Sequence, residues 1–326
     1  MRKIFFIALI TIALLMAGCS GTTNSEKSTE KEYKIGVLLS DTGLGDESFN
    51  DSAFRGLEKA RDELGILFDY REAPDGDFQS PLEELSQQGN DLVIGLGFSV
   101  QEAIEKTAEK YPEQQYLLID GVSEMENVTS ITFKEHEGSF LVGMVAAMIS
   151  QNQKLGVIGG ADVPVIHRFE KGFEQGAKYI NPEISFISEY ANNFGDAKLG
   201  RKIAEKQIKE GVDFIYPAAG FTGVGAIQAA QDNKIFTAGV DSDQYFVAEK
   251  AVVTSMMKNI DVAVFNMAEQ LVKEGKIGQD IYELGLAENG VGLAPIRNFN
   301  LSDEQTKAIE AAKEKITTGN ITINLN

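Results

Sequence analysis

Short apolar runs alternate with amphipathic segments along the chain after residue 33. The first series of alternating runs covers residues 34–39, 49–64, 66–71, 82–89, 91–97, 100–111 and 115–120. This alternation is typical of a parallel sheet with helices on both faces. The pattern therefore predicts an α/β fold.

The alternation then starts again. After an apolar run at 128–133, a second series covers residues 138–150, 154–160, 169–180, 184–190, 197–211, 213–220, 223–232 and 234–241. A chain of 326 residues is about twice the usual size of one domain. Two successive α/β units of similar size predict two similar lobes.

The first eighteen residues, MRKIFFIALITIALLMAG, combine a basic start with a short apolar run, which predicts a secretion signal. The segment LMAGC resembles the lipobox of bacterial lipoproteins, although Met16 stands where leucine is preferred. Cys19, the only cysteine, is then expected to carry lipid and to anchor the protein at the extracytoplasmic face of the cell membrane. The alternative is a cleaved signal with an incidental cysteine. Residues 19–32 are polar and predict a flexible tether, so the folded body begins near Tyr33.

The chain is acidic, with 49 Asp and Glu residues against 30 Lys and Arg residues and a formal charge of −19. Loss of Arg2 and Lys3 with the signal would make the mature protein more negative. A surface of this charge repels polyanions, so we expect no nucleic acid partner. The same field disfavours phosphorylated ligands.

The carboxyl ends of the predicted strands carry acids, aromatics and glycines. Ligands of open α/β sheets bind at these ends, where loops and helix amino ends meet. The residues expected there are Asp41, Phe98, Asp120, Gly160 to Asp162, Phe194, Gly220 and Asp241. Because both halves contribute acids and aromatics at these ends, we expect two lobes that close on one flat, polar ligand.

The loop SDTGLGDESFND, residues 40–51, contains Asp41, Asp46, Phe49, Asn50 and Asp51. It lacks the alternating oxygen spacing of a calcium loop, so we expect no metal. A solvated loop remains the simple alternative, because glycines explain its turns. Phe49 is harder to explain in that way, although it could pack as a staple on the following helix.

Three further segments contain candidate polar contacts. Asp241, at the end of an apolar run, could accept hydrogen bonds from two vicinal hydroxyls, whereas Asp243 could cap the next helix. Lys258 ends another apolar run and is either a surface lysine or a hydroxyl donor. The segment GFTGVG from Gly220 is interpreted as a tight turn that brings backbone close to a neutral ligand.

The sequence contains few groups suited to catalysis. His136 and His167 are the only histidines, and neither belongs to an HExxH motif. A GxSxG motif is absent as well, although a pair of carboxylates for glycoside chemistry stays open. We therefore expect a binding protein without a cofactor and not an enzyme.

Several motifs together resemble a known family. SFND, FEKGFEQGAK, AAGFTGVG, GVDSDQ and TSMMKNIDVAV, in that order, are similar to the basic membrane protein family of ABC-transporter substrate-binding lipoproteins, of the purine nucleoside receptor A type. The similarity runs from about Tyr33 to Asn300. It implies a type I periplasmic-binding-protein fold, in which two Rossmann-like lobes with parallel sheets are joined by a three-crossover hinge. The expected lobes are 33–133 with 258–285, and 134–257 with 286–326.

The resemblance also implies a ligand site and partners. Two phenylalanines, matching Phe49 and Phe194, would enclose a purine base. The polar contacts of base and ribose carry over to Asn50, Asp120, Gly220, Asp241 and Lys258, with Asp41 and Asp51 as neighbours, and Phe98 is added from its position after a strand. The implied partners are a purine nucleoside and the permease and ATPase of an ABC importer, with the receptor as a monomer.

Two departures and two alternatives qualify this interpretation. Phe221 replaces a usual glycine and Asp51 a usual glutamine, which leaves the preferred nucleoside open. A lipid-anchored signalling receptor of the same fold is the alternative from another functional class. A sugar or furanose-like compound is the alternative ligand, since acids at strand ends suit any polyol.

Overall fold

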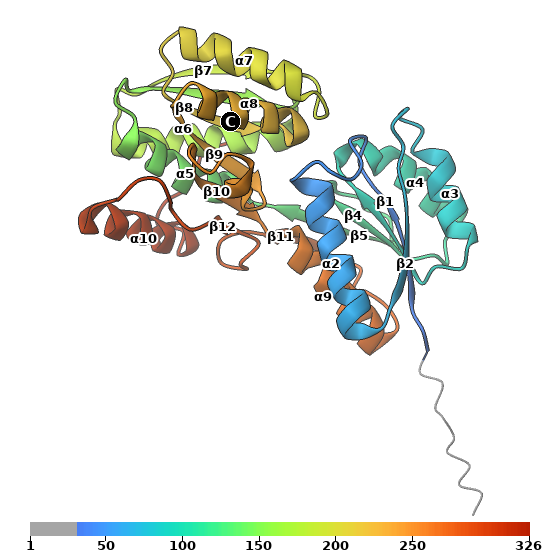
Figure 1. Ribbon diagram of the computed structural model, residues 1–326. Coiled ribbons are helices and arrows are strands. Elements are labelled where there is room, and N and C mark those ends of the chain that lie inside the picture. Colours follow the sequence, from blue (N-terminus) through green and yellow to red (C-terminus); the bar gives the residue numbers. More distant parts are fainter. Residues whose placement is uncertain (1–30) are drawn as a thin grey trace, which may run out of the picture. The chain divides into compact units, whose positions relative to one another are not determined.

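The computed structural model describes residues 31–326, and residues 33–326 form one compact unit (Figure 1). The predicted signal, Cys19 and nearly all of the predicted tether lie outside the described residues. Within residues 31–326, every helix is too short or too polar to span a bilayer.

The first lobe is built on a six-stranded sheet with the strand order β11-β5-β4-β3-β1-β2. All of its neighbouring strands are parallel. Its elements are β1 (Lys34–Leu38), α2 (Phe49–Leu64), β2 (Leu67–Arg71), α3 (Gln79–Gln87), β3 (Leu92–Leu96), α4 (Gln101–Lys110), β4 (Tyr116–Ile119), β5 (Val128–Phe133), α9 (Ile260–Glu274) and β11 (Ile281–Leu284).

Helices cover both faces of this sheet. Helices α2 and α9 pack together on one face and α3 with α4 on the other (Figure 1). In β3, Leu92 and Ile94 join the core under α2, whereas Val93 faces the α3 and α4 side. Strands buried on both faces are expected in a parallel sheet, which explains why these runs are apolar throughout.

The second lobe repeats this plan with the strand order β12-β10-β9-β8-β6-β7. Its pairs are parallel except for the edge pair of β10 and β12. Its elements are α5 (Glu135–Ile149), β6 (Lys154–Gly159), α6 (Pro164–Ile180), β7 (Ser185–Tyr190), α7 (Ala197–Lys209), β8 (Phe214–Ala218), α8 (Gly220–Asp232), β9 (Phe236–Asp241), β10 (Val252–Lys258), β12 (Val291–Leu293) and α10 (Asp303–Thr317). The prediction of two similar α/β lobes is confirmed.

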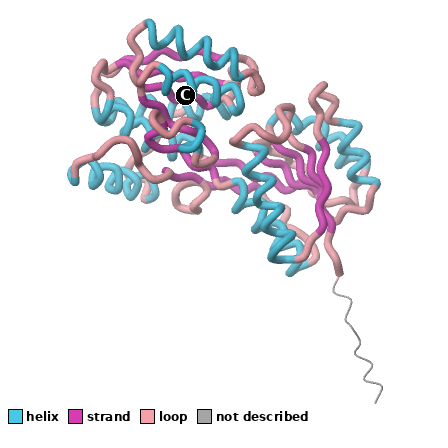
Figure 2. Tube along the Cα trace, in the orientation of Figure 1, coloured by secondary structure: helices cyan, strands magenta, loops and turns pink. Residues whose placement is uncertain are grey.

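The described chain passes between the two sheets three times (Figure 2). It leaves the first sheet after β5, returns between β10 and β11, and crosses again between β11 and β12. Because equivalent strands occupy equivalent places, β4 corresponds to β9, and β3 to β8. The ends of these strands supply most of the site described below.

The predicted turn at GFTGVG is wrong except for its first residue. Gly220 has a positive φ of 53°, and helix α8 begins there and continues through the other glycines. The glycines instead allow α7 and α8 to approach closely. A Cβ atom on Gly225 would lie 1.8 Å from the carbonyl oxygen of Ala197.

Helices α5 and α6 pack closely for the same reason. A Cβ atom on Gly176 would lie 1.8 Å from the Phe140 carbonyl oxygen, and one on Gly143 would lie 2.0 Å from that of Phe173. Such distances exclude any side chain at these two positions without a shift of backbone. The close approach brings the amino end of α5, with Glu135, next to Arg168 on α6.

Candidate ligand-binding site

A cavity of about 110 Å³ lies at the carboxyl ends of the central strands of both sheets. The lining residues are Ser40, Asp41, Thr42, Asp46, Phe49, Gly97, Phe98, Ser99, Asp120, Val165, Ile166, Phe169, Phe194, Ala218, Ala219, Gly220, Val240, Asp241 and Lys258.

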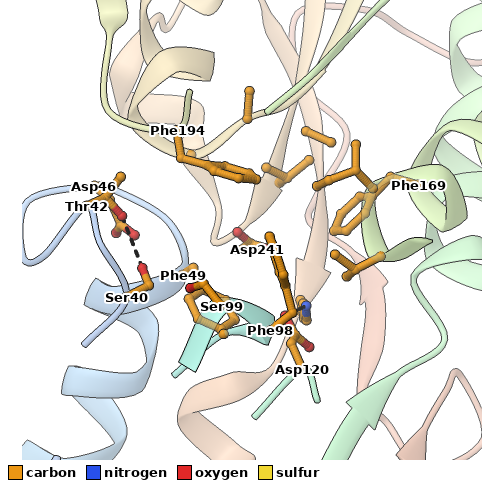
Figure 3. Close-up of a pocket in the computed structure, with 18 of the residues that line it drawn as sticks. Ser40, Thr42, Asp46, Phe49, Phe98, Ser99, Asp120, Phe169, Phe194 and Asp241 are labelled. Carbon is orange, nitrogen blue, oxygen red and sulfur yellow. Dashed lines mark hydrogen bonds and ion pairs between the residues drawn. The ribbon is translucent and has the colours of Figure 1, made fainter. Parts of the chain in front are cut away.

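Four phenylalanine side chains line the cavity. Phe49 and Phe98 belong to the first lobe, and Phe169 and Phe194 to the second (Figure 3). The ring centroids of Phe98 and Phe194 are 6.5 Å apart, with an angle of 59° between the planes. A base stacked between two rings needs about 3.5 Å to each, so Phe98 and Phe194 meet too closely and at too steep an angle to hold one between them. Phe98 is 38% exposed.

Two carboxylates occupy equivalent places in the two lobes. Asp120 directly follows β4, and Asp241 ends β9. Both have left-handed backbone conformations, with φ of 63° and 64°, which are uncommon for residues other than glycine. Strain of this kind persists where the surrounding structure holds it, often at binding sites. Both side chains reach the cavity (Figure 3).

A buried ion-pair network joins the end of β10 to both lobes. The Lys258 Nζ lies 2.5 Å from Asp120 Oδ2 and 3.0 Å from Glu135 Oε1. The other Glu135 oxygen accepts a hydrogen bond of 2.5 Å from Arg168 Nε. The side chains of Lys258 and Glu135 are 2% and 0% exposed. Buried charges of this kind are stable only in combination, since each alone carries a large desolvation penalty.

Aromatic rings surround the same ammonium group. The Lys258 Nζ lies 5.3, 5.1 and 5.8 Å from the ring centroids of Phe49, Phe133 and Phe169. Rings at such distances attract a cation through their negative faces. Phe49 and Phe169 therefore lie close to the Lys258 ammonium group and also line the cavity.

The pKa values in the network follow from burial and neighbouring charge. Burial would lower the pKa of Lys258, but Asp120, Glu135 and Asp241 outweigh it and raise that pKa, so the ammonium stays charged. Burial would raise the pKa of Glu135, but Lys258 and Arg168 outweigh it and lower the pKa.

The pKa values of the two carboxylates at the strand ends, Asp241 and Asp120, are both raised. Burial raises the pKa of Asp241 to about 6 although Lys258 and Ser48 oppose the shift. Burial also raises the pKa of Asp120, against the attraction of Lys258. Asp120 Oδ1 is buried and has no hydrogen-bond partner within residues 31–326. A ligand hydroxyl or N–H group would satisfy that acceptor and relieve its cost.

The loop before α2 is organised by its own polar side chains. Asn50 is fully buried, and its side-chain amide donates to Ser40 Oγ, Thr42 Oγ1 and Asp46 Oδ2. Asp51 accepts hydrogen bonds from the backbone N–H groups of Gly45 and Glu47. Neither Asn50 nor Asp51 lines the cavity. Both residues therefore shape the loop that presents Asp41 and Phe49, in contrast to the direct contact expected for Asn50.

The structure brings together Asp41, Phe49, Phe98, Asp120, Phe194, Gly220, Asp241 and Lys258, as predicted from the sequence. Gly160 to Asp162, which were expected at the same strand ends, do not line the cavity. Phe221 is 37% exposed and lies outside the lining. Asp243 accepts a hydrogen bond from the Tyr245 N–H at the start of a short 3₁₀ helix, Gln244–Val247, as the capping alternative predicted. Among residues 31–326, no group of three or more histidine, cysteine or acidic side chains is placed to hold a metal ion.

Sequence reasoning from strand ends missed Phe169, Glu135, which pairs with Lys258, and Arg168, which pairs with Glu135. Phe169 lies in the segment FEKGFEQGAK, within a helix, and not at the end of a strand. Glu135 begins a helix and Arg168 lies inside one, so no strand-end rule could find them. An acid two residues after the apolar run 128–133 was the available signal for Glu135.

A two-lobed α/β fold with a polar and aromatic cavity at the strand ends of both lobes defines a solute-binding protein. Residues 33–326 match the family Bmp, described as "ABC transporter substrate-binding protein PnrA-like". The chain belongs to this family of ABC transporter substrate-binding proteins and is not an enzyme. Substrate-binding proteins of such transport systems act on the extracytoplasmic side of the membrane.

Similar proteins agree with this assignment. The chain is 31% identical to Basic membrane protein A of Borreliella afzelii, over 94% of this chain and 95% of that protein. It is 34% identical to an uncharacterized lipoprotein of Pyrococcus abyssi, over 90% of this chain and 77% of that protein. A crystal structure of ABC transporter solute-binding protein from Aeropyrum pernix K1 is similar with a TM-score of 0.83 and 30% identity, covering 90% of this chain and 94% of that one. The predicted type I periplasmic-binding-protein fold is confirmed.

Proposed function

We propose that the protein binds a purine nucleoside in this cavity and delivers it to the permease and ATPase of an ABC importer. The observation that carries the proposal is the combination of phenylalanine rings from both lobes with buried carboxylates at equivalent strand ends. A nucleoside has one flat apolar part and one part rich in hydroxyl groups. The cavity offers both kinds of surface.

The aromatic side of the cavity suits the base. Phe49 and Phe194 come from different lobes, so a base that stacks on both would gain the full contact only when the lobes are close. Stacking on one aromatic side chain contributes about 1–3 kcal/mol. The ring centroid of Phe98 is 6.5 Å from that of Phe194, so Phe98 would have to turn aside for a base to stack on Phe194.

The polar side suits the sugar. Asp120 has an unsatisfied acceptor oxygen, and Asp241 is a second acceptor within the same cavity. Lys258 is the donor beside them. The excess of carboxylates would repel a phosphate group, which favours nucleosides over nucleotides.

Calorimetric titration tests the proposal. Residues 33–326 would be unfolded and refolded once to remove carried ligand, then titrated with guanosine, inosine, adenosine, uridine and ribose. We expect micromolar or tighter binding of the purine nucleosides and none of ribose. Ribose binding as strong as that of guanosine would contradict the proposal in favour of a sugar or furanose-like ligand, and silence from all five would favour a signalling receptor for another compound.

Replacement of Phe194 by alanine should weaken guanosine binding. One lost stacking contact of about 1–3 kcal/mol corresponds to a loss of affinity of roughly five- to 150-fold. Calorimetry measures the change. Phe246→Ala is the matched control, because this phenylalanine of the same lobe is 79% exposed and outside the cavity. Equal affinities of the two variants would remove Phe194 from the site.

We also propose that Cys19 carries a lipid that anchors the protein on the outer face of the cell membrane. The lipobox-like segment LMAGC and the similarity to a lipoprotein of Pyrococcus abyssi support this assignment. Mass spectrometry of the amino-terminal peptide from purified membranes tests it. An unmodified thiol at Cys19 in the mature protein would contradict it.

A further inference from the structure

Ser48 holds an unusual position at the amino end of α2. A serine that directly precedes a helix usually accepts a hydrogen bond from the first free N–H groups of that helix. The Ser48 side chain makes no such bond. Its hydroxyl donates instead to Asp241 Oδ2 of the other lobe, at 2.5 Å, and both residues are buried.

Asp46 takes over the capping role. Its carboxylate accepts hydrogen bonds from the backbone N–H groups of Ser48, Asn50 and Asp51, at 2.9, 2.8 and 3.2 Å. The N–H groups of Asn50 and Asp51 in the first turn of α2 are therefore satisfied without the serine hydroxyl. This arrangement leaves Ser48 free to connect the two lobes.

Three more hydrogen bonds join the same two segments, one of them from Ser242 Oγ to the Ser48 carbonyl oxygen at 3.5 Å. The Gln244 Nε2 donates to the Glu47 carbonyl oxygen at 3.0 Å, and Gln244 is itself buried. The Arg55 Nη2 donates to Ser242 Oγ at 2.6 Å. We call these six residues, Glu47, Ser48, Arg55, Asp241, Ser242 and Gln244, the latch.

The latch lies beside the ligand cavity. Five of its residues, all except Ser48, line a second cavity, and Asp241 lines both. The residues on either side of Glu47 and Ser48, namely Asp46 and Phe49, line the first cavity. The carboxylate expected to hold the ligand is therefore also the acceptor of the central hydrogen bond between the lobes.

We propose that the latch closes the lobes in the absence of ligand and that Ser48 is a positioning residue, which sets affinity through the closed fraction and does not select the ligand. Only the closed form presents both lobes to a ligand, so apparent affinity scales with the closed fraction. A loss of the latch therefore weakens every ligand by the same factor. The predicted effect of the latch on ligand affinity rests on the proposed function, whereas the predicted closure without ligand does not.

Distance measurements between spin labels test closure in the ligand-free protein. Residues 33–326 contain no cysteine and hold both sheets and their cores, so they can be labelled at Glu109→Cys on α4 and Lys202→Cys on α7, both exposed. We expect Ser48→Ala to shift the distance distribution away from the closed distance. Ser86→Ala is the control, since it removes a serine hydrogen bond to Tyr116 inside one lobe. An unchanged distribution in Ser48→Ala, or a parent protein that is fully open without ligand, would overturn the proposal.

Titration with guanosine and inosine tests the effect on affinity. Because a hydrogen bond to a charged group is lost, we expect Ser48→Ala to weaken both nucleosides by about tenfold and to preserve their ratio. A change in the ratio would overturn the positioning role and make Ser48 a selectivity residue. If neither nucleoside binds the parent protein, the proposed function fails, while the label distances still decide on the latch.

Discussion

Replacement of Lys258 by methionine is expected to lower the free energy of unfolding by about 3–5 kcal/mol at neutral pH. Methionine keeps most of the volume but removes the buried ammonium. Asp120 and Glu135 would then lose the cation that lies within 3.0 Å of both. A buried carboxylate left without its partner carries the desolvation penalty uncompensated.

The loss of stability should depend on pH. Lys258 lowers the pKa of Asp120 and of Asp241, so its removal raises both. Protonation removes the uncompensated charge, and the loss should therefore be smaller at pH 5 than at pH 8. Urea unfolding at both pH values measures the difference.

Lys106→Met is the matched control. Lys106 pairs with Glu102 on one helix, and its side chain is 62% exposed. An exposed ion pair contributes little, so this variant should remain almost as stable as the parent. A Lys258→Met protein that is as stable as the control would show that the network does not support the fold.

Replacement of Asp241 by asparagine is expected to stabilise the ligand-free protein and to weaken ligand binding. Burial raises the pKa of Asp241 from its ordinary 3.8 to about 6. A raised carboxyl pKa favours the folded state at low pH, and that contribution is lost as pH rises from about 4 through about 6. A difference of about two pKa units corresponds to about 3 kcal/mol.

Asparagine has the shape of the protonated acid and no charge. The variant should therefore be more stable than the parent by about 3 kcal/mol at pH 7 and equally stable near pH 4. Its amide has one acceptor oxygen where the carboxylate has two, and an NH2 donor in place of the other, so nucleoside affinity should fall at least tenfold. Urea unfolding across this pH range and calorimetry provide the two measurements.

Asp243→Asn is the control for this prediction. Asp243 lies two residues away and pairs with Arg297 at 2.8 Å, so its replacement should bring no gain in stability. An Asp241→Asn protein that is less stable than the parent at pH 7 would mean that the fold favours the charged carboxylate. The prediction that the Asp241 charge lowers stability while it supports ligand binding would then be wrong.

Local sequence patterns predicted most of the fold and part of the site. The apolar and amphipathic alternation predicted helix 49–64 with the bounds of α2, and it predicted two successive α/β units. Such periodicity is visible because each strand and helix repeats its own side-chain spacing. The rule that ligands bind at strand ends then located Phe98, Asp120 and Asp241, because parallel strands bring their carboxyl ends to one edge.

Tertiary packing alone decided the charges and the connections between the lobes. Lys258 and Asp120 lie 138 residues apart in the chain, and Ser48 and Asp241 lie 193 apart. Arg168 reaches Glu135 because glycines let α5 and α6 approach closely. The sequence by itself determined which segments form strands and helices and which side chains stand at strand ends. Contacts between distant segments determine the ion-pair partners, the place of Phe169 in the cavity lining and the latch. Local periodicity contains no information about such contacts.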